Sequence, residues 1–176
     1  MVFDQEELEK GNCVLTLYAQ WFGTGIEDKV DGMVKSDVVI KNTGTVREYI
    51  RAAITANWYK DGSIVAPWSV DSTGKCSQGK FTDLLKSGTG WILGADGYYY
   101  YTYPVDGAEE LKKASGNTLF DKYEYEEKDI PVEGAHLEMQ IMVQSVIWDK
   151  DKTEVTEAWG SDVANKLYSK KPEQSK

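Results

Sequence analysis

A histidine and a glutamate two positions apart are the first residues in this chain that could do chemistry. His136 is the only histidine. Strand side chains alternate between faces, so Glu138 would share a strand face with it. Such a pair can bind a metal ion or exchange protons. The alternative is an ordinary exposed histidine on a solvated strand. The HExxH motif of zinc proteases needs two histidines and is therefore absent.

No other arrangement of residues indicates a reaction centre. A Ser-His-Asp triad would have to include His136, and no serine lies in a GxSxG sequence. The segment Gly23-Thr24-Gly25 lacks the third glycine and the following helix of a phosphate-binding loop, so we interpret it as a turn. The sequence therefore predicts a protein that is not an enzyme and that has no cofactor and no metal site.

Acidic groups and cysteines leave alternatives open. Two groups of carboxylates could offer oxygens to calcium, although neither has the DxDxDG spacing and solvated charge is the other interpretation. They are Asp149, Asp151 and Glu154 in one group, and Glu124, Glu126, Glu127 and Asp129 in the other. Cys13 and Cys76 either form a disulfide or remain two free thiols, and the sequence does not decide between these states.

A run of tyrosines predicts an interaction surface. In an extended strand, Tyr99, Tyr101 and Tyr103 lie on one face, and a sandwich of two layers buries one face only. We therefore expect exposed rings here, which together with Trp68 would suit protein contacts or stacking on sugars. The alternative is a strand whose rings pack beneath a loop.

Alternating hydrophobic residues predict the elements that would position these groups. Strands are expected at 12–22, 33–41, 45–59 and 135–148, with shorter ones near 64–66, 91–93, 98–105 and 119–127. The turn Asn42-Thr43-Gly44 predicts that the strands on either side pair as a hairpin. Val155, Trp159, Val163 and Leu167 recur every four residues, which predicts a helix whose apolar stripe lies on the sheet edge. The fold class is mainly all-β: an antiparallel β-sandwich of jelly-roll or immunoglobulin-like type, with short helices including one near the C-terminus.

The length of the chain limits the number of domains, and its net charge limits the kinds of partner. The 176 residues suit one domain at 12–169, preceded by an N-terminal segment, 1–11, and followed by a disordered tail, 170–176. The net charge of -9 argues against nucleic acid, and no run is apolar enough to cross a bilayer. The acidic N-terminus lacks the regions of a signal peptide, so we expect either a cytosolic protein or a mature form with a start methionine added.

An ordered set of short segments carries a resemblance to a known family. The set spans most of residues 38–160 and resembles the TasA/camelysin type of exported protein, and more closely its relatives described as alternate-signal-mediated exported proteins. The segments are Val39-Ile40-Lys41-Asn42-Thr43-Gly44, Tyr49-Ile50-Arg51-Ala52-Ala53-Ile54, Asp96-Gly97-Tyr98-Tyr99-Tyr100-Tyr101-Thr102, Thr118-Leu119-Phe120-Asp121, Gln140-Ile141-Met142-Val143-Gln144-Ser145-Val146 and Glu157-Ala158-Trp159-Gly160.

The resemblance implies a secreted jelly-roll protein. Members of this type build extracellular fibres, biofilm matrix or pilus-like filaments, sometimes by lending an N-terminal strand to the next subunit. Val2-Phe3-Asp4 resembles the start of such a mature chain. Camelysin is described as a surface metalloprotease, but no motif here supports that activity, and the family offers no catalytic residues to place on these positions.

Two main hypotheses follow from the sequence. The first is a secreted, non-enzymatic cell-surface or matrix protein that self-associates, or binds other surface proteins, by donating an N-terminal strand with Val2, Phe3 and Leu8 as its apolar groups. The second is a carbohydrate-binding or adhesive module that uses Tyr99, Tyr101 and Trp68. A hydrolase around His136 and Glu138 is a third and disfavoured alternative.

Overall fold

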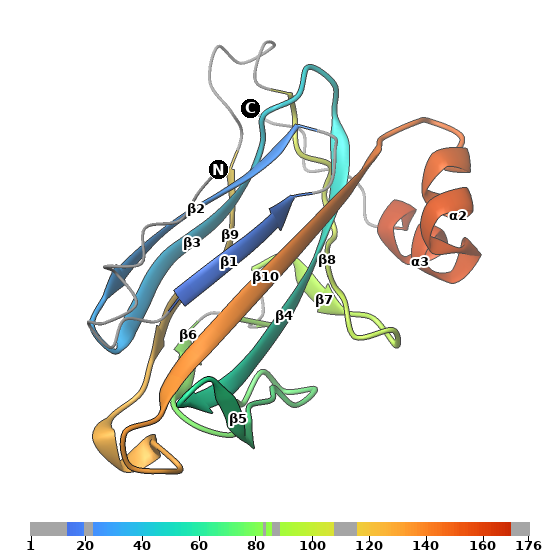
Figure 1. The fold of residues 1–176 in the computed structure, drawn as a ribbon. Coiled ribbons are helices and arrows are strands. Elements are labelled where there is room, and N and C mark those ends of the chain that lie inside the picture. The colour runs from blue at the N-terminus through green and yellow to red at the C-terminus, as the bar shows by residue number, and fades with distance from the viewer. Residues whose placement is uncertain (1–13, 20–22, 83, 86–88, 108–115, 170–176) are drawn as a thin grey trace.

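The chain folds into two stacked β-sheets with two short helices at the C-terminal end (Figure 1). The computed structural model describes residues 14–19, 23–82, 84–85, 89–107 and 116–169. The strands are β1 Val14–Ala19, β2 Thr24–Asp31, β3 Val34–Asn42, β4 Glu48–Lys60, β5 Ser63–Pro67, β6 Lys80–Thr82, β7 Trp91–Leu93, β8 Tyr99–Tyr101, β9 Gly116–Glu124 and β10 His136–Ile147. A 3-10 turn, η2, covers Glu127–Asp129, and the helices are α2 Thr153–Trp159 and α3 Ser161–Tyr168.

The first sheet is built around the two longest strands. Its order is β1-β10-β4-β8-β7, with β5 also paired to β4. β4 and β10 are antiparallel along their whole length, from the pair His136–Tyr59 to the pair Ile147–Glu48. The second sheet has the order β2-β3-β9-β6, and its neighbours are also antiparallel. The expected all-β sandwich is confirmed.

The core lies between the sheets, as the alternation in the sequence predicts. Leu137, Met139, Ile141 and Val143 of β10 are at most 1% exposed. The same period places Ile50, Ala52, Ala56 and Trp58 of β4 in this core, together with Val38, Ile40, Leu119 and Phe120 of the second sheet. Burial of these side chains provides the main driving force for folding.

The connection after β3 differs from the expected hairpin. β3 belongs to the second sheet and β4 to the first, so the turn at Asn42-Thr43-Gly44 carries the chain from one layer to the other. The Asn42 side chain is fully buried, and its amide donates hydrogen bonds to the carbonyls of Val46, at 2.6 Å, and Val105, at 3.0 Å. These bonds hold an arch between the sheets, and the prediction that β3 pairs with β4 is wrong.

A third layer covers part of the outer face of the first sheet. Val155 of α2 and Leu167 of α3 are fully buried and pack with Tyr49 and Tyr100, whose side chains leave the sheet on the side away from the main core. The expected helical stripe is confirmed, but it packs on the outer face of the sheet and not on its edge. Gly160, with φ of 87°, separates the two helices.

Candidate functional site

The outer edge of β10 is occupied by β1, the first described strand. β1 runs parallel to β10 in the register Val14–Glu138 to Ala19–Val143 (Figure 1). On its other side β10 is fixed by β4, with which it pairs from His136 to Ile147. An edge strand is held through its backbone on one side only. β1 is therefore bound to the sheet in the manner of an added strand, without a hairpin to its partner.

The proposed donor residues Val2, Phe3 and Leu8 lie outside the described residues, as does Cys13. Cys76 is buried, and its thiol donates to the carbonyl of Gly79, at 2.8 Å. Burial raises the pKa of this thiol above its ordinary value. The Cys76 environment is thus that of a packed core residue.

The predicted aromatic surface is largely covered. Trp68 is 6% exposed and Tyr99 is 4% exposed, and both belong to the main core. The Trp68 indole donates to the hydroxyl of Tyr123, at 3.1 Å. Tyr101 and Tyr103 are half-buried, with ring centroids 5.8 Å apart. The expected exposure of Trp68 and Tyr99 is therefore wrong, because these rings lie between the two sheets.

His136 and Glu138 share the outer face of β10, as predicted. The Nε2 atom of His136 lies 3.1 Å from a Glu138 carboxylate oxygen, and both side chains are about one-third exposed (34% and 30%). Over the described part of the chain, no group of three or more His, Cys, Asp or Glu side chains is placed to hold a metal ion. The His136 ring stacks on the ring of Tyr59, with ring centroids 6.2 Å apart.

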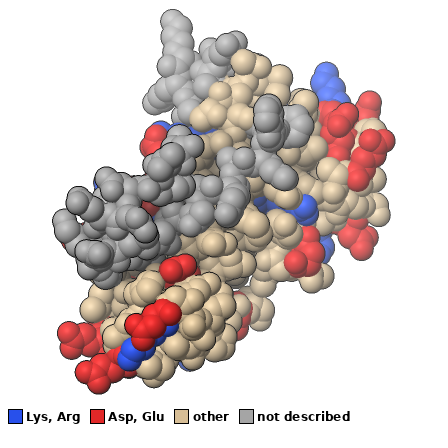
Figure 2. All heavy atoms as spheres, in the orientation of Figure 1, with Lys and Arg blue, Asp and Glu red and all other residues tan. Residues whose placement is uncertain are grey.

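The two acidic groups make local contacts. Asp149 accepts the backbone N–H groups of Thr153, at 2.8 Å, and Glu154, at 3.4 Å, at the start of α2. Glu124 lies in ion pairs with Lys122 and Lys80. Figure 2 shows acidic side chains over the C-terminal helices and at the opposite end of the same face.

An arginine on the outer face of β4 organises a site that the sequence reasoning missed. The Arg51 side chain is 15% exposed, and its guanidinium carbon lies 4.0 Å from the ring centroid of Tyr98 and 5.1 Å from that of Trp159. Its Nε and Nη2 atoms donate to the carbonyl oxygen of Gln144, at 2.8 Å and 2.6 Å. Nη1 donates to the hydroxyl of Tyr100, at 3.0 Å. The alternation along β4 places Arg51 on the outer face, but no local pattern places it beside the tyrosine-rich segment.

Asp96 completes this cluster at the turn between β7 and β8. One oxygen of its carboxylate accepts the Tyr100 hydroxyl, at 2.6 Å, and lies 3.5 Å from Arg51. The other oxygen accepts the backbone N–H of Tyr98, at 3.3 Å. The Asp96 side chain remains 44% exposed. Burial, with the Asp96 hydrogen bond adding to it, raises the pKa of Tyr100 to about 12, so this tyrosine keeps its proton at neutral pH.

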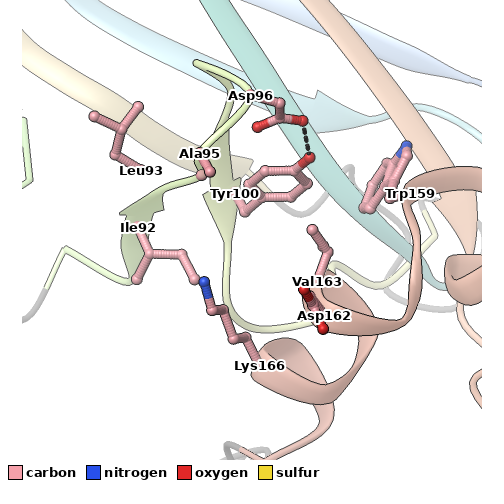
Figure 3. Close-up of a pocket in the computed structure, with 10 residues that line it drawn as sticks. Ile92, Leu93, Ala95, Asp96, Tyr100, Trp159, Asp162, Val163 and Lys166 are labelled. Carbon is pink, nitrogen blue, oxygen red and sulfur yellow. Dashed lines mark hydrogen bonds between the residues drawn. The ribbon is translucent and has the colours of Figure 1, made fainter.

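A hollow of about 190 Å³ opens beside Asp96, where the β7–β8 turn faces the junction of α2 and α3 (Figure 3). Its apolar wall includes Ile92, Trp159 and Val163. Asp162 and Lys166 of α3 reach it from the opposite side to Asp96. The arrangement combines a carboxylate in a fixed position with an apolar wall and two further charged groups.

Fold and sites together define a helix-capped, two-sheet antiparallel β-sandwich with an N-terminal strand added at one edge. No protein-family model, no curated protein and no solved structure matches this chain significantly. None of the described helices is long and apolar enough to span a membrane.

Proposed function

We propose that this chain is a secreted, non-enzymatic structural subunit of a cell surface or extracellular matrix, and that it self-associates by exchanging its N-terminal strand. The observation that supports this proposal is the position of β1, which is added in parallel to the outer edge of β10. The resemblance to TasA/camelysin-like exported proteins is in agreement with it.

The way in which β1 is held supports strand exchange. Its partner β10 is far away in the sequence, and the chain returns from β1 to the other sheet through β2. The β1 of a second copy can therefore occupy the same edge in the same register and form the same backbone hydrogen bonds. Because exchange preserves these contacts, its cost is small and concentration favours the assembled form.

The acceptor edge would stay in place when β1 leaves. Leu137, Met139, Ile141 and Val143 fix β10 in the core, and β4 pairs with it throughout. An empty edge would then expose unpaired backbone groups, which favour binding of another strand. In this proposal Val2, Phe3 and Leu8, which precede β1, extend the donated segment.

A truncated chain and a synthetic peptide test the proposal. We expect the intact chain to form oligomers or filaments as its concentration rises, and a chain lacking residues 1–19 to form none. A peptide of residues 1–19 should bind the truncated chain and raise its melting temperature. Size-exclusion chromatography, electron microscopy and thermal unfolding measure these effects.

The intact chain provides a second test that does not depend on folding of the truncated form. Excess peptide of residues 1–19 should compete for the edge of β10 and shorten or prevent the assemblies. A peptide with the same composition in scrambled order is the control. Assemblies that form equally well without residues 1–19, or that ignore the excess peptide, would rule out strand exchange.

A further inference from the structure

The hollow beside Asp96 has the composition of a binding site for a small polar molecule. Asp96, on the β7–β8 turn, is only half-exposed. Tyr100, Arg51 and the backbone of Tyr98 hold its carboxylate by the contacts described above. A carboxylate fixed in this way still has lone pairs for further donors, since two oxygens together accept about four hydrogen bonds. Its position is set before any ligand arrives, which lowers the entropic cost of binding.

Arg51 supports the hollow from behind and does not line it. Its guanidinium group is enclosed by Tyr98 and Trp159 and donates to Gln144. Together with the hydrogen bond from Arg51 to Tyr100, these contacts connect β4, β8, β10 and α2, so the wall formed by Trp159 is tied to the sheet. The hollow therefore lies on a rigid base made from four elements.

The charges around the hollow point to a neutral ligand. The lining contains two carboxylates, Asp96 and Asp162, and one ammonium group, Lys166. Arg51, next to Asp96, adds a second positive charge and brings the formal sum to zero. A phosphate or other strong anion would meet both carboxylates, and a strong cation would meet Lys166 in the hollow and the positive charge of Arg51 behind its wall.

The hollow is lined by the apolar side chains of Ile92, Val163 and Trp159, and polar groups reach it from two opposite sides, Asp96 on one and Lys166 on the other. A sugar ring has the matching character, because its C–H groups form an apolar face and its hydroxyls donate and accept at the rim. Aromatic rings and carboxylates are suited to these two parts of a sugar. A purely aliphatic ligand would leave the carboxylates desolvated and unpaired.

We propose that this hollow binds a single sugar ring, as the terminal unit of a glycan. Its C–H face lies against Trp159 and Val163, and two of its hydroxyls donate to Asp96 and accept from Lys166. The site uses none of the strand-exchange surface on β10, so it is independent of the proposed function.

Titration of the full chain with simple glycosides tests the site. The probes are the methyl glycosides of glucose, galactose, mannose and N-acetylglucosamine, added to nitrogen-15-labelled protein and followed by NMR. We expect at least one glycoside to give saturable shifts with a millimolar dissociation constant. The shifts should concentrate on the Trp159 indole and on the backbone of Ala95, Asp96 and Val163.

Matched variants separate a specific site from weak general contact. Asp96→Asn removes a charged acceptor and should weaken binding by roughly tenfold or more. Lys166→Gln, at the exposed rim, should weaken binding without touching the Arg51 cluster, which covers the case in which Asp96→Asn fails to fold. Glu157→Gln, on α2 and outside the hollow, should leave affinity unchanged.

Three results would overturn the proposal. The first is the absence of saturable shifts with all four glycosides. The second is a set of shifts that maps to residues away from the hollow. The third is an affinity that remains the same in the folded Asp96→Asn and Lys166→Gln variants.

Discussion

Replacing Glu48 by glutamine should stabilise the folded chain at neutral pH. Glu48 lies on the inner face of β4 and is 2% exposed. One of its carboxylate oxygens, Oε2, has no hydrogen-bond partner in the described structure. Burial raises the pKa of this carboxyl, and a hydrogen bond with Ser145 opposes the shift only in part. The charged form of Glu48 is therefore less favourable in the folded chain than in the unfolded one.

The sign of the pH dependence follows from this shift. A carboxyl with a raised folded-state pKa binds its proton more tightly in the folded chain. The associated stability is fully present below the unfolded-state pKa, about 4.3 for glutamate, and is lost as pH rises through the folded-state pKa. Glutamine has no charge to bury, so Glu48→Gln should remove this loss.

The cost of burying the charged, unpartnered carboxylate sets the expected change in the free energy of unfolding. Leaving a buried polar group unsatisfied costs about 1–3 kcal/mol, and more when it is charged. A glutamine amide at this position also lacks a partner but carries no charge, so Glu48→Gln recovers only the added cost of the charge, and we expect about 1 kcal/mol at neutral pH. In a chain of this size, each kcal/mol raises the melting temperature by roughly 2–4 °C.

Thermal and urea unfolding at about pH 4 and about pH 8, on either side of the expected transition, measure the effect. The difference between the variant and the parent chain isolates Glu48 from the other titrating groups. Glu133→Gln, at an exposed loop position, is the control and should change neither stability nor its pH slope. A Glu48→Gln chain that is less stable than the parent at high pH, or that keeps the parent's pH slope, would refute this reasoning.

Two further substitutions test the helical layer and one loop. Leu167→Ala deletes the fully buried side chain that packs α3 on the sheet, so it should cost about 2–5 kcal/mol in urea unfolding; a cost near zero would show that the helices are not held this way. Gly79→Ala should cost clearly more than Gly62→Ala. Both glycines have positive φ, of 68° and 73°, but an added Cβ at Gly79 would lie 2.5 Å from the Glu124 carbonyl and at Gly62 would meet nothing within 4 Å. Equal losses in melting temperature would contradict the steric argument.

The sequence predicted the long strands well because each of them has one face in the core. On β4 and β10 the alternation is nearly complete, and the residues on its apolar face, such as Ile50, Trp58, Leu137 and Ile141, are buried in the structure. The missed strand β2 has no such pattern, since it lies at a sheet edge and most of its side chains are partly or fully exposed. Periodicity therefore finds strands that have one buried face and overlooks a strand such as β2, which has no buried face.

Neither the pairing of the strands around Asn42-Thr43-Gly44 nor the burial of the tyrosines could be predicted from local patterns. The Asn42-Thr43-Gly44 turn is compatible with a hairpin and with an arch, and the choice depends on Val105, which is distant in the sequence and accepts a bond from Asn42. Tyr99 and Tyr100 are both buried although they point to opposite faces, because α2 and α3 cover the outer face as a third layer.

The candidate site at Arg51 was only partly visible in the sequence. Alternation along β4 places Arg51 outward, and the tyrosine segment predicts an interaction surface, but neither pattern places the two side by side. The contact between them depends on the register of β4 and β8, in which Arg51 pairs with Tyr100. Trp159 joins them only because the chain folds back after β10. Contacts between residues so far apart in the sequence are set by the tertiary structure and leave no signal in the local sequence pattern.

Disulfide trapping between two different copies tests strand exchange most directly. Thr16 and Gln140 are paired between β1 and β10, and neighbouring strands lie about 4.8 Å apart, within the range that a disulfide spans. One chain carries Thr16→Cys and the other Gln140→Cys, both with Cys13→Ser and Cys76→Ala. Thr55→Cys, on β4 at the position paired with Gln140, replaces Gln140→Cys in the control. After mixing and oxidation, the account predicts a disulfide-linked dimer between the first two chains, in excess of the control; a mixture with no more dimer than the control would contradict it.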